Sequence, residues 1–437
     1  MQPIRIGLLG AGTVGGGTIK LLKTNNIEIK RRLGRDLIIS HIATRNIERA
    51  LRLVDENTIV CQDINEVVNA KDIDIVIELI GGTTTAREAV VQAIKNGKHI
   101  VTANKKLLAE YGNEIFALAA KHNVMVMFEA AIAGGIPIVK ALREGLAANQ
   151  ISSIAGIING TSNFILSEMR ANNSPFADAL KQAQELGYAE ADPTFDIEGQ
   201  DAGHKLSLMS ALAFGTPINF QQCYLEGINN LESQDIQYAE ELGYRIKLLG
   251  ITRKTEQGIE LRVHPTLVPE TRLIAKVEGV MNAVSVQANM VGQTLYYGAG
   301  AGAGPTASAV VADIIDIVRL IDSDIHNCVP YLAFQPALLN AEPILSIDQI
   351  VSSYYLRVSA HDEPGVLGEI ANILAEAQIS IEALIQKGVI SHETAEIVIL
   401  THSVQEGYIK AAIKKIEALP RILSPITMIR MESLSSR

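Results

Sequence analysis

Short, almost continuous apolar runs alternate with amphipathic segments over the first third of the chain. The runs that we predict to be strands are residues 4–10, 37–45, 74–81, 99–105 and 124–130. One amphipathic segment, residues 86–98, places its apolar side chains on one helical face: Ala89, Val90, Ala93 and Ile94. Strands without a polar face are typical of a parallel sheet with helices on both sides. The predicted fold class is therefore α/β with a doubly wound parallel sheet.

The pattern changes near residue 136, where longer helices and three further strand-like runs begin, at residues 151–160, 259–268 and 283–292. This mixture predicts an α+β domain. Residues 333–350 contain two prolines and are predicted to be a connector. After the connector, the apolar pattern indicates a strand, a helix, two strands, a helix and a strand. That order is typical of a ferredoxin-like domain.

Composition and charge limit the classes of protein. The chain has 437 residues, 48% of them hydrophobic and 20% charged, which favours two or three folded domains over disorder. Its net charge of −10 argues against a general nucleic-acid or anionic-membrane binder. The three cysteines are scattered, the N-terminus lacks a secretory signal pattern, and no apolar run is long enough to span a bilayer. We expect a cytoplasmic protein without membrane partners.

A glycine motif follows the first predicted strand and opens a helix. Gly10, Gly12 and Gly15 fit the G-x-G-x-x-G pattern, with Thr13 and Val14 between the last two glycines. In that setting the first glycine permits a tight turn, the second lets a pyrophosphate approach, and the third lets helix pack on strand. The motif predicts a Rossmann-type dinucleotide site. The alternative is a merely flexible loop, which the further glycines at positions 16 and 17 would also fit.

Three polar residues at the ends of predicted strands are candidate ligand contacts. Arg45 stands where a site selective for NAD usually carries an acid, so it favours NADP, although a solvated arginine would look the same. Lys105 ends the fourth predicted strand and could face cofactor and substrate, or be an ordinary loop lysine. Glu129 ends a buried run before an irregular glycine-rich loop, which fits either a hard cation or a helix N-cap.

Residues 198–215 begin polar and become almost wholly apolar. Asp201 and Lys205 are four apart and share a helical face. They form either a solvated helix start or the place where a substrate meets the protein. His204 lies between them in sequence and is interpreted as a packing or hydrogen-bonding residue.

The whole set of motifs resembles homoserine dehydrogenase. The likeness is carried, in family order, by residues 7–17, 101–105, 128–146, 156–166, 185–206 and 298–313. Residues 361–381, with the run HDEPGVLGEI, resemble the ACT domain that many bacterial members carry. The chain departs from the family pattern at two glycines. Gly203 stands where the family more often has alanine, and Gly304 makes the second glycine-rich loop looser than usual. Both put the rigidity of the substrate loops in doubt.

The resemblance implies the reversible reduction of L-aspartate 4-semialdehyde to L-homoserine with NAD(P)H, in threonine and methionine biosynthesis. It implies that Lys205 donates the proton, that Asp201 positions it, and that Lys105 is a second active-site lysine. Glu190 matches the glutamate that binds homoserine. The remaining implied pocket and cofactor positions are Asp196, Tyr188, Gly160, Thr161 and Gly302.

The resemblance also implies a structural sodium or other monovalent cation, held by Glu129 and the backbone carbonyls of Ile132, Gly134 and Ile136. ACT domains typically pair side by side and bind amino acids between first strand and helix, here residues 362–367. We therefore expect an amino-acid effector, with threonine suspected, and a homodimer or homotetramer. A dimerisation module without a ligand is the alternative for the tail.

The predicted domains are a nucleotide-binding domain at residues 1–132 completed by 305–332, a substrate and dimerisation domain at 133–304, the linker at 333–350 and the ACT domain at 351–437. Two other functions compete with this interpretation. One is a related NAD(P) oxidoreductase acting on another amino-acid aldehyde or imine, and the intact set of Glu190, Asp196, Asp201 and Lys205 argues against it. The other is a non-enzymatic amino-acid sensor, which predicts eroded glycine loops that this chain does not show.

Overall fold

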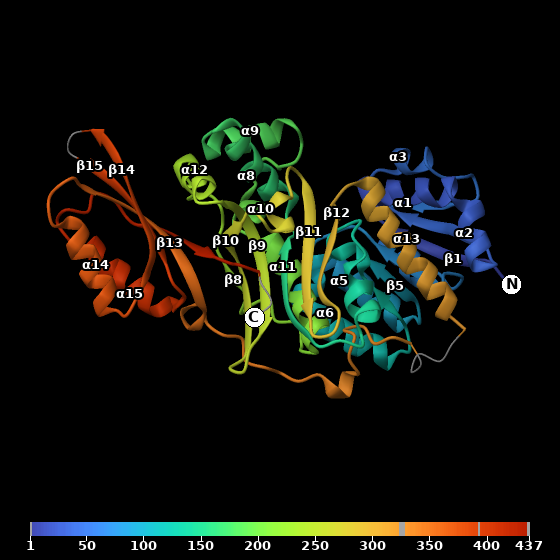
Figure 1. Ribbon diagram of the computed structural model, residues 1–437. Coiled ribbons are helices and arrows are strands. Elements are labelled where there is room, and N and C mark those ends of the chain that lie inside the picture. The colour runs from blue at the N-terminus through green and yellow to red at the C-terminus, as the bar shows by residue number, and fades with distance from the viewer. Residues whose placement is uncertain (1, 323–327, 392–393, 435–437) are drawn as a thin grey trace. The chain divides into compact units, whose positions relative to one another are not determined.

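A computed structural model describes residues 2–322, 328–391 and 394–434 (Figure 1). These residues form two compact units. Unit 1 is Met1–Ile154, His204–Gln221 and Met281–Glu342, and unit 2 is Ala155–Gly203, Gln222–Val280 and Pro343–Arg437. Two continuous elements cross the boundary, strand β7 (Ile151–Ile157) and helix α11 (Gln200–Phe214). The predicted domain ranges include residues 1, 323–327, 392–393 and 435–437, which lie outside the described residues, and the four-part division stays a prediction.

Unit 1 is built on a six-stranded sheet in the order β3-β2-β1-β4-β5-β6. The strands are β1 (Ile4–Leu9), β2 (Leu37–Ala43), β3 (Ile59–Cys61), β4 (Ile75–Glu78), β5 (His99–Thr102) and β6 (Val126–Met127). All neighbouring pairs are parallel. The strand order reverses between β1 and β4, which is the point where doubly wound sheets bind ligands. The predicted Rossmann-type sheet is confirmed.

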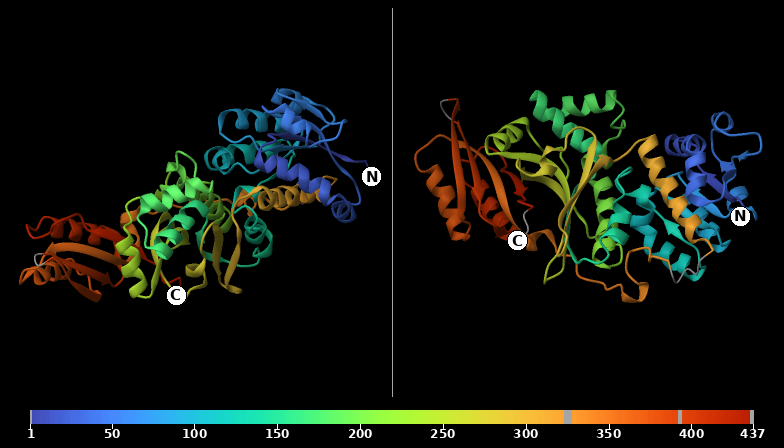
Figure 2. Two further views of the ribbon diagram at one scale, coloured as in Figure 1. Left: turned by 90° about the horizontal axis from the view of Figure 1, so that it is seen from above. Right: turned by 45° about the vertical axis from the view of Figure 1, so that its right-hand side comes forward.

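One helical layer of unit 1 comes from distant parts of the chain. Helix α13 (Ala303–Leu320) lies beside α1 (Thr13–Thr24), as Figures 1 and 2 show, and near α2 (Asn26–Leu33). Ile314 and Val310 of α13 share a buried core with Ile19 of α1 and with the strand residues Ile6 and Leu8. The other elements of unit 1 are α3 (Ile47–Leu51), α4 (Ile64–Asn69), α5 (Thr84–Lys95), α6 (Lys105–Lys121), η1 (Glu129–Ala131), α7 (Ile138–Lys140), η2 (Ala141–Gly145), η5 (Pro336–Leu338) and the hairpin β11 (Met281–Ala288) and β12 (Gly292–Ala299).

Asparagine and aspartate side chains begin several of these helices. Asn104 accepts a hydrogen bond from Leu107 N at the start of α6, and Asn46 accepts one from Arg49 N at the start of α3. Asp63 does the same for α4. Such caps satisfy backbone N–H groups that have no partner within the helix, at about 1 kcal/mol each. The helices that surround the carboxyl edge of the sheet therefore start at positions fixed by the local sequence.

Unit 2 contains strands in the order β9-β10-β17-β13-β15-β14. Its elements before the tail are α8 (Gly160–Asn172), α9 (Phe176–Glu185), α10 (Thr194–Ile197), β8 (Tyr224–Leu225), α12 (Ser233–Glu241), β9 (Tyr244–Lys254), β10 (Ile259–Pro269) and η3 (Leu273–Lys276). Strands β9 and β10 are antiparallel over their whole length. Strand β10 also pairs in parallel with the tail strand β17 (Thr427–Met431), with Thr266 opposite Arg430. One sheet thus joins the tail to the rest of unit 2.

The tail has the predicted ferredoxin-like order. Its elements are η6 (Ile347–Gln349), β13 (Val351–His361), α14 (Val366–Glu376), β14 (Ile381–Ser391), β15 (Thr394–Thr401), β16 (Val404–Gln405), α15 (Glu406–Glu417) and β17. Helices α14 and α15 lie side by side on one face of the sheet (Figures 1 and 2). Ile370 and Leu374 of α14 and Ile409 of α15 pack there against Leu356 and Ile399 of the strands.

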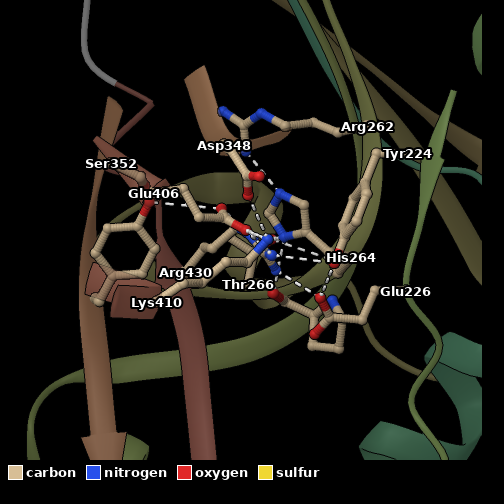
Figure 3. A network of polar contacts seen from close by, with 12 residues as sticks. Tyr224, Glu226, Arg262, His264, Thr266, Asp348, Ser352, Glu406, Lys410 and Arg430 are labelled. Atoms are coloured by element: carbon tan, nitrogen blue, oxygen red, sulfur yellow. Dashed lines mark hydrogen bonds and ion pairs between the residues drawn. The ribbon is translucent and has the colours of Figure 1, made fainter. Parts of the chain in front are cut away.

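Buried ion pairs reinforce the junction between the tail and β10 (Figure 3). Arg430, with no exposed surface, donates to Glu406 of α15 at 2.6 Å and to Glu226, next to β8, at 2.7 Å. Arg262 of β10 donates to Glu432 at 2.5 Å and to His264 Nε2 at 2.6 Å. These charges are paired on all sides, as burial requires.

The predicted connector, residues 333–350, forms backbone hydrogen bonds with neighbouring segments of each unit. Asn340 N donates to Gly215 O within unit 1, and Leu345 N donates to Ile259 O at the start of β10 within unit 2. None of the described helices combines the length and the apolar character that crossing a membrane requires. The cysteines at 61, 223 and 328 are all free thiols.

Candidate active site

The glycine motif of unit 1 has a separate structural reason for each glycine. Gly10 has a φ of 97°, and a Cβ there would lie 2.7 Å from Leu79 O. A Cβ on Gly15 would lie 2.0 Å from Gly10 O, so only glycine lets α1 pack on β1. A Cβ on Gly12, by contrast, would point into open space, with no described atom within 4 Å apart from those of its own stretch of chain. Gly12 and Thr13 are exposed at the start of α1, where backbone N–H groups favour an anion.

The second glycine-rich loop meets the first motif. A Cβ on Gly17 would lie 2.5 Å from Ala303 O, so glycine lets α1 approach the start of α13. Gly302 precedes α13 with a φ of 120°, a backbone conformation that favours glycine. Gly16 and Gly17 both lie within α1, so the interpretation of these glycines as a flexible loop is wrong. The close approach of Gly17 to Ala303 could not be predicted from the sequence, because the two residues lie almost 300 positions apart.

Arg45 stands exposed two residues after β2, at the carboxyl edge of the sheet. Asn46 beside it caps α3, which fixes the local chain direction. The end of β2 therefore presents an exposed guanidinium at the carboxyl edge of the sheet.

Two further residues at this edge, Glu78 and Asn104, were not predicted from the sequence. Glu78 ends β4 with no exposed surface, and its Oε1 accepts from Ile80 N at 3.0 Å and Gly81 N at 3.1 Å. Its Oε2 accepts from the Thr102 hydroxyl of β5 at 2.7 Å, so it ties the two strand ends together. Asn104 caps α6 and donates to Gly82 O at 2.7 Å. Lys105 is the first residue of α6, directly after these anchored strands.

Glu129 is 2% exposed and its carboxylate caps the start of α7. Oε1 accepts from Val139 N at 2.8 Å, and Oε2 accepts from Lys140 N at 2.9 Å. Its own N–H donates to the buried Asp313 of α13 at 2.8 Å. Burial raises the pKa of Glu129, and burial next to Glu129 raises the pKa of Asp313 well above its usual value. Glu129 thus accepts two N–H groups at the start of α7, whereas the residue at the N-cap position of that helix is Pro137.

The loop after Glu129 is tightly held. Gly134 has a φ of 52°, and a Cβ there would lie 2.3 Å from Gly300 O. Gly135 N donates to Ala299 O, while Ile136 O accepts from Ile138 N at 2.8 Å. Carboxylate and carbonyl oxygens suit a hard cation, and each capped Glu129 oxygen keeps a free lone pair. The donor set, with Ile132 O as its fourth member, therefore fits a monovalent ion, but the same contacts also explain the loop without one.

In unit 2, several predicted substrate residues gather at the start of α8. Thr161 donates its hydroxyl proton to Tyr188 O at 2.6 Å. Gly160 passes so close to Val280 that a Cβ would lie 2.7 Å from its carbonyl oxygen. The Tyr188 ring is 43% exposed and meets Phe164 edge-on, with 5.0 Å between ring centroids. Glu190 follows with an exposed side chain.

Asn159, which the sequence analysis did not single out, joins the two acidic candidates. Its Nδ2 donates to Asp196 Oδ1 at 2.7 Å and to Asp201 Oδ2 at 2.9 Å. Its Oδ1 accepts from Ser162 N at 2.8 Å and so caps α8. The predicted residues Asp196 of α10 and Asp201 of α11 are thereby held at one point of unit 2.

Helix α11 carries Asp201 and Lys205 one turn apart, as their spacing predicted. Asp201 is 3% exposed and Lys205 8% exposed, so the interpretation as a solvated helix start is wrong. His204 is 2% exposed and packs against Phe220, with ring centroids 4.1 Å apart, which agrees with a packing role. A buried lysine following a buried aspartate is an arrangement suited to proton transfer.

Comparison with known proteins identifies the family. The model described as "Homoserine dehydrogenase" matches residues 137–315, and "Homoserine dehydrogenase, NAD binding domain" matches residues 10–129. The chain belongs to the homoserine dehydrogenase family. It is similar to the homoserine dehydrogenase of Neisseria gonorrhoeae, 69% identical over 99% of this chain and 100% of that one. It is 54% identical to that of Pseudomonas aeruginosa over the full length of both. The crystal structure of a homoserine dehydrogenase from Thiobacillus denitrificans superposes with a TM-score of 0.95 at 58% identity, covering 99% of both chains.

Membership of this family makes the chain an oxidoreductase that uses a nicotinamide cofactor. An ACT-domain model matches residues 354–421, within the ferredoxin-like tail. ACT domains bind amino-acid effectors, so the tail fits allosteric control of a homoserine dehydrogenase. The alternative of a non-enzymatic sensor is excluded by the family and by the close relatives.

Proposed function

We propose that the chain interconverts L-aspartate 4-semialdehyde and L-homoserine in threonine and methionine biosynthesis, with NADP(H) as the preferred cofactor. The observation that carries this proposal is the pair of buried residues one turn apart on α11, Asp201 and Lys205. The neighbouring carboxylate of Asp196 is held by the same asparagine that holds Asp201.

Lys205 is the proton donor of this proposal. During reduction, its ammonium group protonates the oxygen of the former aldehyde, and during oxidation its neutral amine accepts the proton back. Asp201, which precedes it by one turn, favours the charged state of the lysine and holds its orientation. Lys105, at the start of α6, supports the developing charge as a second cation.

The substrate's amino group is cationic and requires carboxylates. We assign Glu190 and Asp196 to that group, because the first is exposed and the second is fixed at the start of α8. Tyr188, Gly160 and Thr161 line the same region of unit 2 and shape the pocket. Since the Thr161 hydroxyl is bonded to Tyr188 O, the two segments hold each other in place.

A bound nicotinamide cofactor supplies or accepts the hydride, and the chain's part is to hold it. The open space at Gly12 and the first N–H groups of α1, at Thr13 and Val14, would receive the pyrophosphate. Gly302 would let the second loop approach the cofactor. Arg45 would bind the 2′-phosphate, which supports NADP over NAD.

A sodium or similar monovalent ion would be held by Glu129 and the carbonyl oxygens of Ile132, Gly134 and Ile136. Its role in this proposal is structural: it would rigidify the loop that follows β6. Free cysteines fit a reducing compartment and support a cytoplasmic location.

For the tail, we propose threonine as a feedback inhibitor bound at residues 362–367, and a homodimer or homotetramer. Gly365 starts α14 with a φ of 98°, and Arg421 lies beside it, paired with Glu363 and Glu369 at 3.1 Å each. A carboxylate ligand would meet backbone N–H groups and a nearby guanidinium there.

The test is homoserine-dependent reduction of NADP and of NAD by the purified chain, each with and without threonine. Lys205→Ala should lower kcat by about 10²–10⁴-fold, the usual contribution of a general acid or base, while NADPH binding followed by fluorescence persists. The matched control is Lys106→Ala, whose side chain is 49% exposed and pairs with Glu110. A Lys205→Ala enzyme with the wild-type kcat would refute the assigned role, and a wild type without activity on homoserine would refute the proposed substrate.

A further inference from the structure

The Asn159 side chain uses its oxygen and its nitrogen for different purposes. Oδ1 accepts from Ser162 N at 2.8 Å and begins α8, while Nδ2 donates to two carboxylates, at 2.7 Å and 2.9 Å. The side chain is 5% exposed. One N–H thus goes to Asp196 and the other to Asp201; the bond to Asp201 is buried and the bond to Asp196 is part-buried.

The helix cap fixes which way the amide points. If the amide were rotated by 180°, Nδ2 would face the Ser162 N–H and Oδ1 would face two carboxylate oxygens, so all three hydrogen bonds would be lost. The cap therefore selects the orientation in which both amide protons face the acids. This arrangement differs from an ordinary capping asparagine, whose amide group usually meets solvent.

The two acids meet at a single nitrogen, and this affects their charge. Two nearby carboxylates disfavour each other's ionisation, and hydrogen bonds donated to the ionised forms oppose that effect. Asn159 donates one such bond to each acid, at distances typical of charge-assisted hydrogen bonds. It is a neutral group that donates to both negative charges at this part-buried corner of unit 2.

We propose that Asn159 is a positioning residue of the reaction, which keeps Asp196 and Asp201 ionised together and fixes their spacing. This inference rests on the roles proposed above for the two acids. An ionised Asp201 holds Lys205 protonated and oriented, and an ionised Asp196 serves the substrate's amino group. One amide thereby coordinates proton transfer with substrate binding.

Asn159→Asp separates this role from helix capping. Aspartate has the same shape and caps helices as well as asparagine does, so the start of α8 is preserved. The variant lacks the two amide protons and adds a third carboxylate to the pair. We expect kcat on homoserine at pH 7 to fall at least about tenfold, KM for homoserine to rise, and the acid limb of the pH profile to move up by about one unit or more.

Two further variants keep the test decisive. Asn159→Ser also caps α8 but adds no charge, so it should shift the acid limb in the same direction by a smaller amount. Asn113→Asp is the matched control: Asn113 also accepts a backbone N–H and donates to a carbonyl, both of Ile218, at 3.0 Å each. It should leave the pH profile unchanged. If Asn159→Asp and Asn159→Ser lose only thermal stability and keep the wild-type pH profile, Asn159 is a helix cap alone and the proposal is overturned.

A readout without turnover separates this proposal from the substrate assignment. Carboxyl ¹³C NMR of aspartate-labelled protein, with Asp196→Asn and Asp201→Asn for assignment, follows the titration of each acid directly. We expect at least one of the two titrations to move to higher pH in Asn159→Asp, whichever substrate the enzyme prefers. Unmoved titrations would overturn the positioning role even in an active homoserine dehydrogenase, whereas a shifted titration in a chain inactive on homoserine would leave it standing.

Discussion

At the scale of single residues, we expect Arg45 to set the preference between the two nicotinamide cofactors. Arg45→Glu places a carboxylate after β2, where it would repel a 2′-phosphate and accept the ribose hydroxyls. A charge-assisted hydrogen bond contributes about 1.5–3 kcal/mol, so kcat/KM with NADP should fall about 10- to 100-fold while that with NAD holds or rises. Steady-state kinetics with both cofactors measure the ratio.

The control for that exchange is Arg31→Glu, because Arg31 of α2 is 76% exposed and pairs with Glu28. It should leave the cofactor preference unchanged. An unaltered NADP to NAD ratio in Arg45→Glu would mean that the guanidinium is merely solvated and that the preference is set elsewhere.

The sequence could predict those residues whose structural environment depends on residues close to them in the chain. The glycines of the first motif and the spacing of Asp201 and Lys205 are local patterns, and the structure gives each a distinct environment. Asn159 and Glu78 escaped, because their partners come from other elements. Nothing in the sequence around Asn159 distinguishes a helix cap from a bridge between two acids.

At the scale of elements, too, local patterns could be predicted from the sequence and long-range pairings could not. The long apolar runs of unit 1 were predicted as strands and lie in the parallel sheet, but β3 has only three residues and gives no periodic signal. Strand β10 was predicted, yet its pairing with β17 was not, since the two are more than 150 residues apart. Registers of that kind depend on tertiary packing, which a local pattern does not contain.

Strand β10 also places a histidine where it cannot take up a proton. His264 is fully buried, accepts from Arg262 at Nε2 and donates from Nδ1 to Pro265 O at 2.9 Å. Burial, with Arg430 and Arg262 nearby, holds its pKa well below 6.5. The unfolded chain binds this proton below about pH 6.5 and the folded chain does not, so stability falls as pH decreases from that value.

His264→Gln removes the titrating group and keeps an acceptor for Arg262. Urea unfolding between pH 8 and pH 5 should show a smaller loss of unfolding free energy below pH 6.5, by up to about 1.4 kcal/mol per pH unit. His402→Gln, at an exposed position, should keep the wild-type slope. Equal slopes for His264→Gln and wild type would place the acid sensitivity in other groups.

At the scale of the whole molecule, the tail is part of the architecture of unit 2 and not an appendage to it. Its last strand, β17, lies between β10 and β13, and Glu432 supplies a carboxylate to the buried Arg262. Arg357 of β13 donates to Asp235 of α12 at 2.6 Å, and Asp235 has no exposed surface. Removing the tail would thus take Arg357 away from the buried Asp235 and leave Glu260 as the carboxylate partner of Arg262.

We therefore expect a chain shortened to residues 1–350 to be destabilised and not simply released from feedback. Breaking one buried ion pair typically costs about 3–5 kcal/mol, which is comparable with the whole stability of many domains. Thermal unfolding of the shortened chain should shift down by about 10 °C or more, or the chain should aggregate. In the shortened chain, Asp235→Asn should recover part of that loss, because it removes the buried charge that has lost Arg357. In the full chain, Glu363→Ala alters only the exposed pair with Arg421 and should keep the wild-type Tm. A shortened chain that matches the full chain in Tm would show that β17 and its ion pairs contribute little to stability.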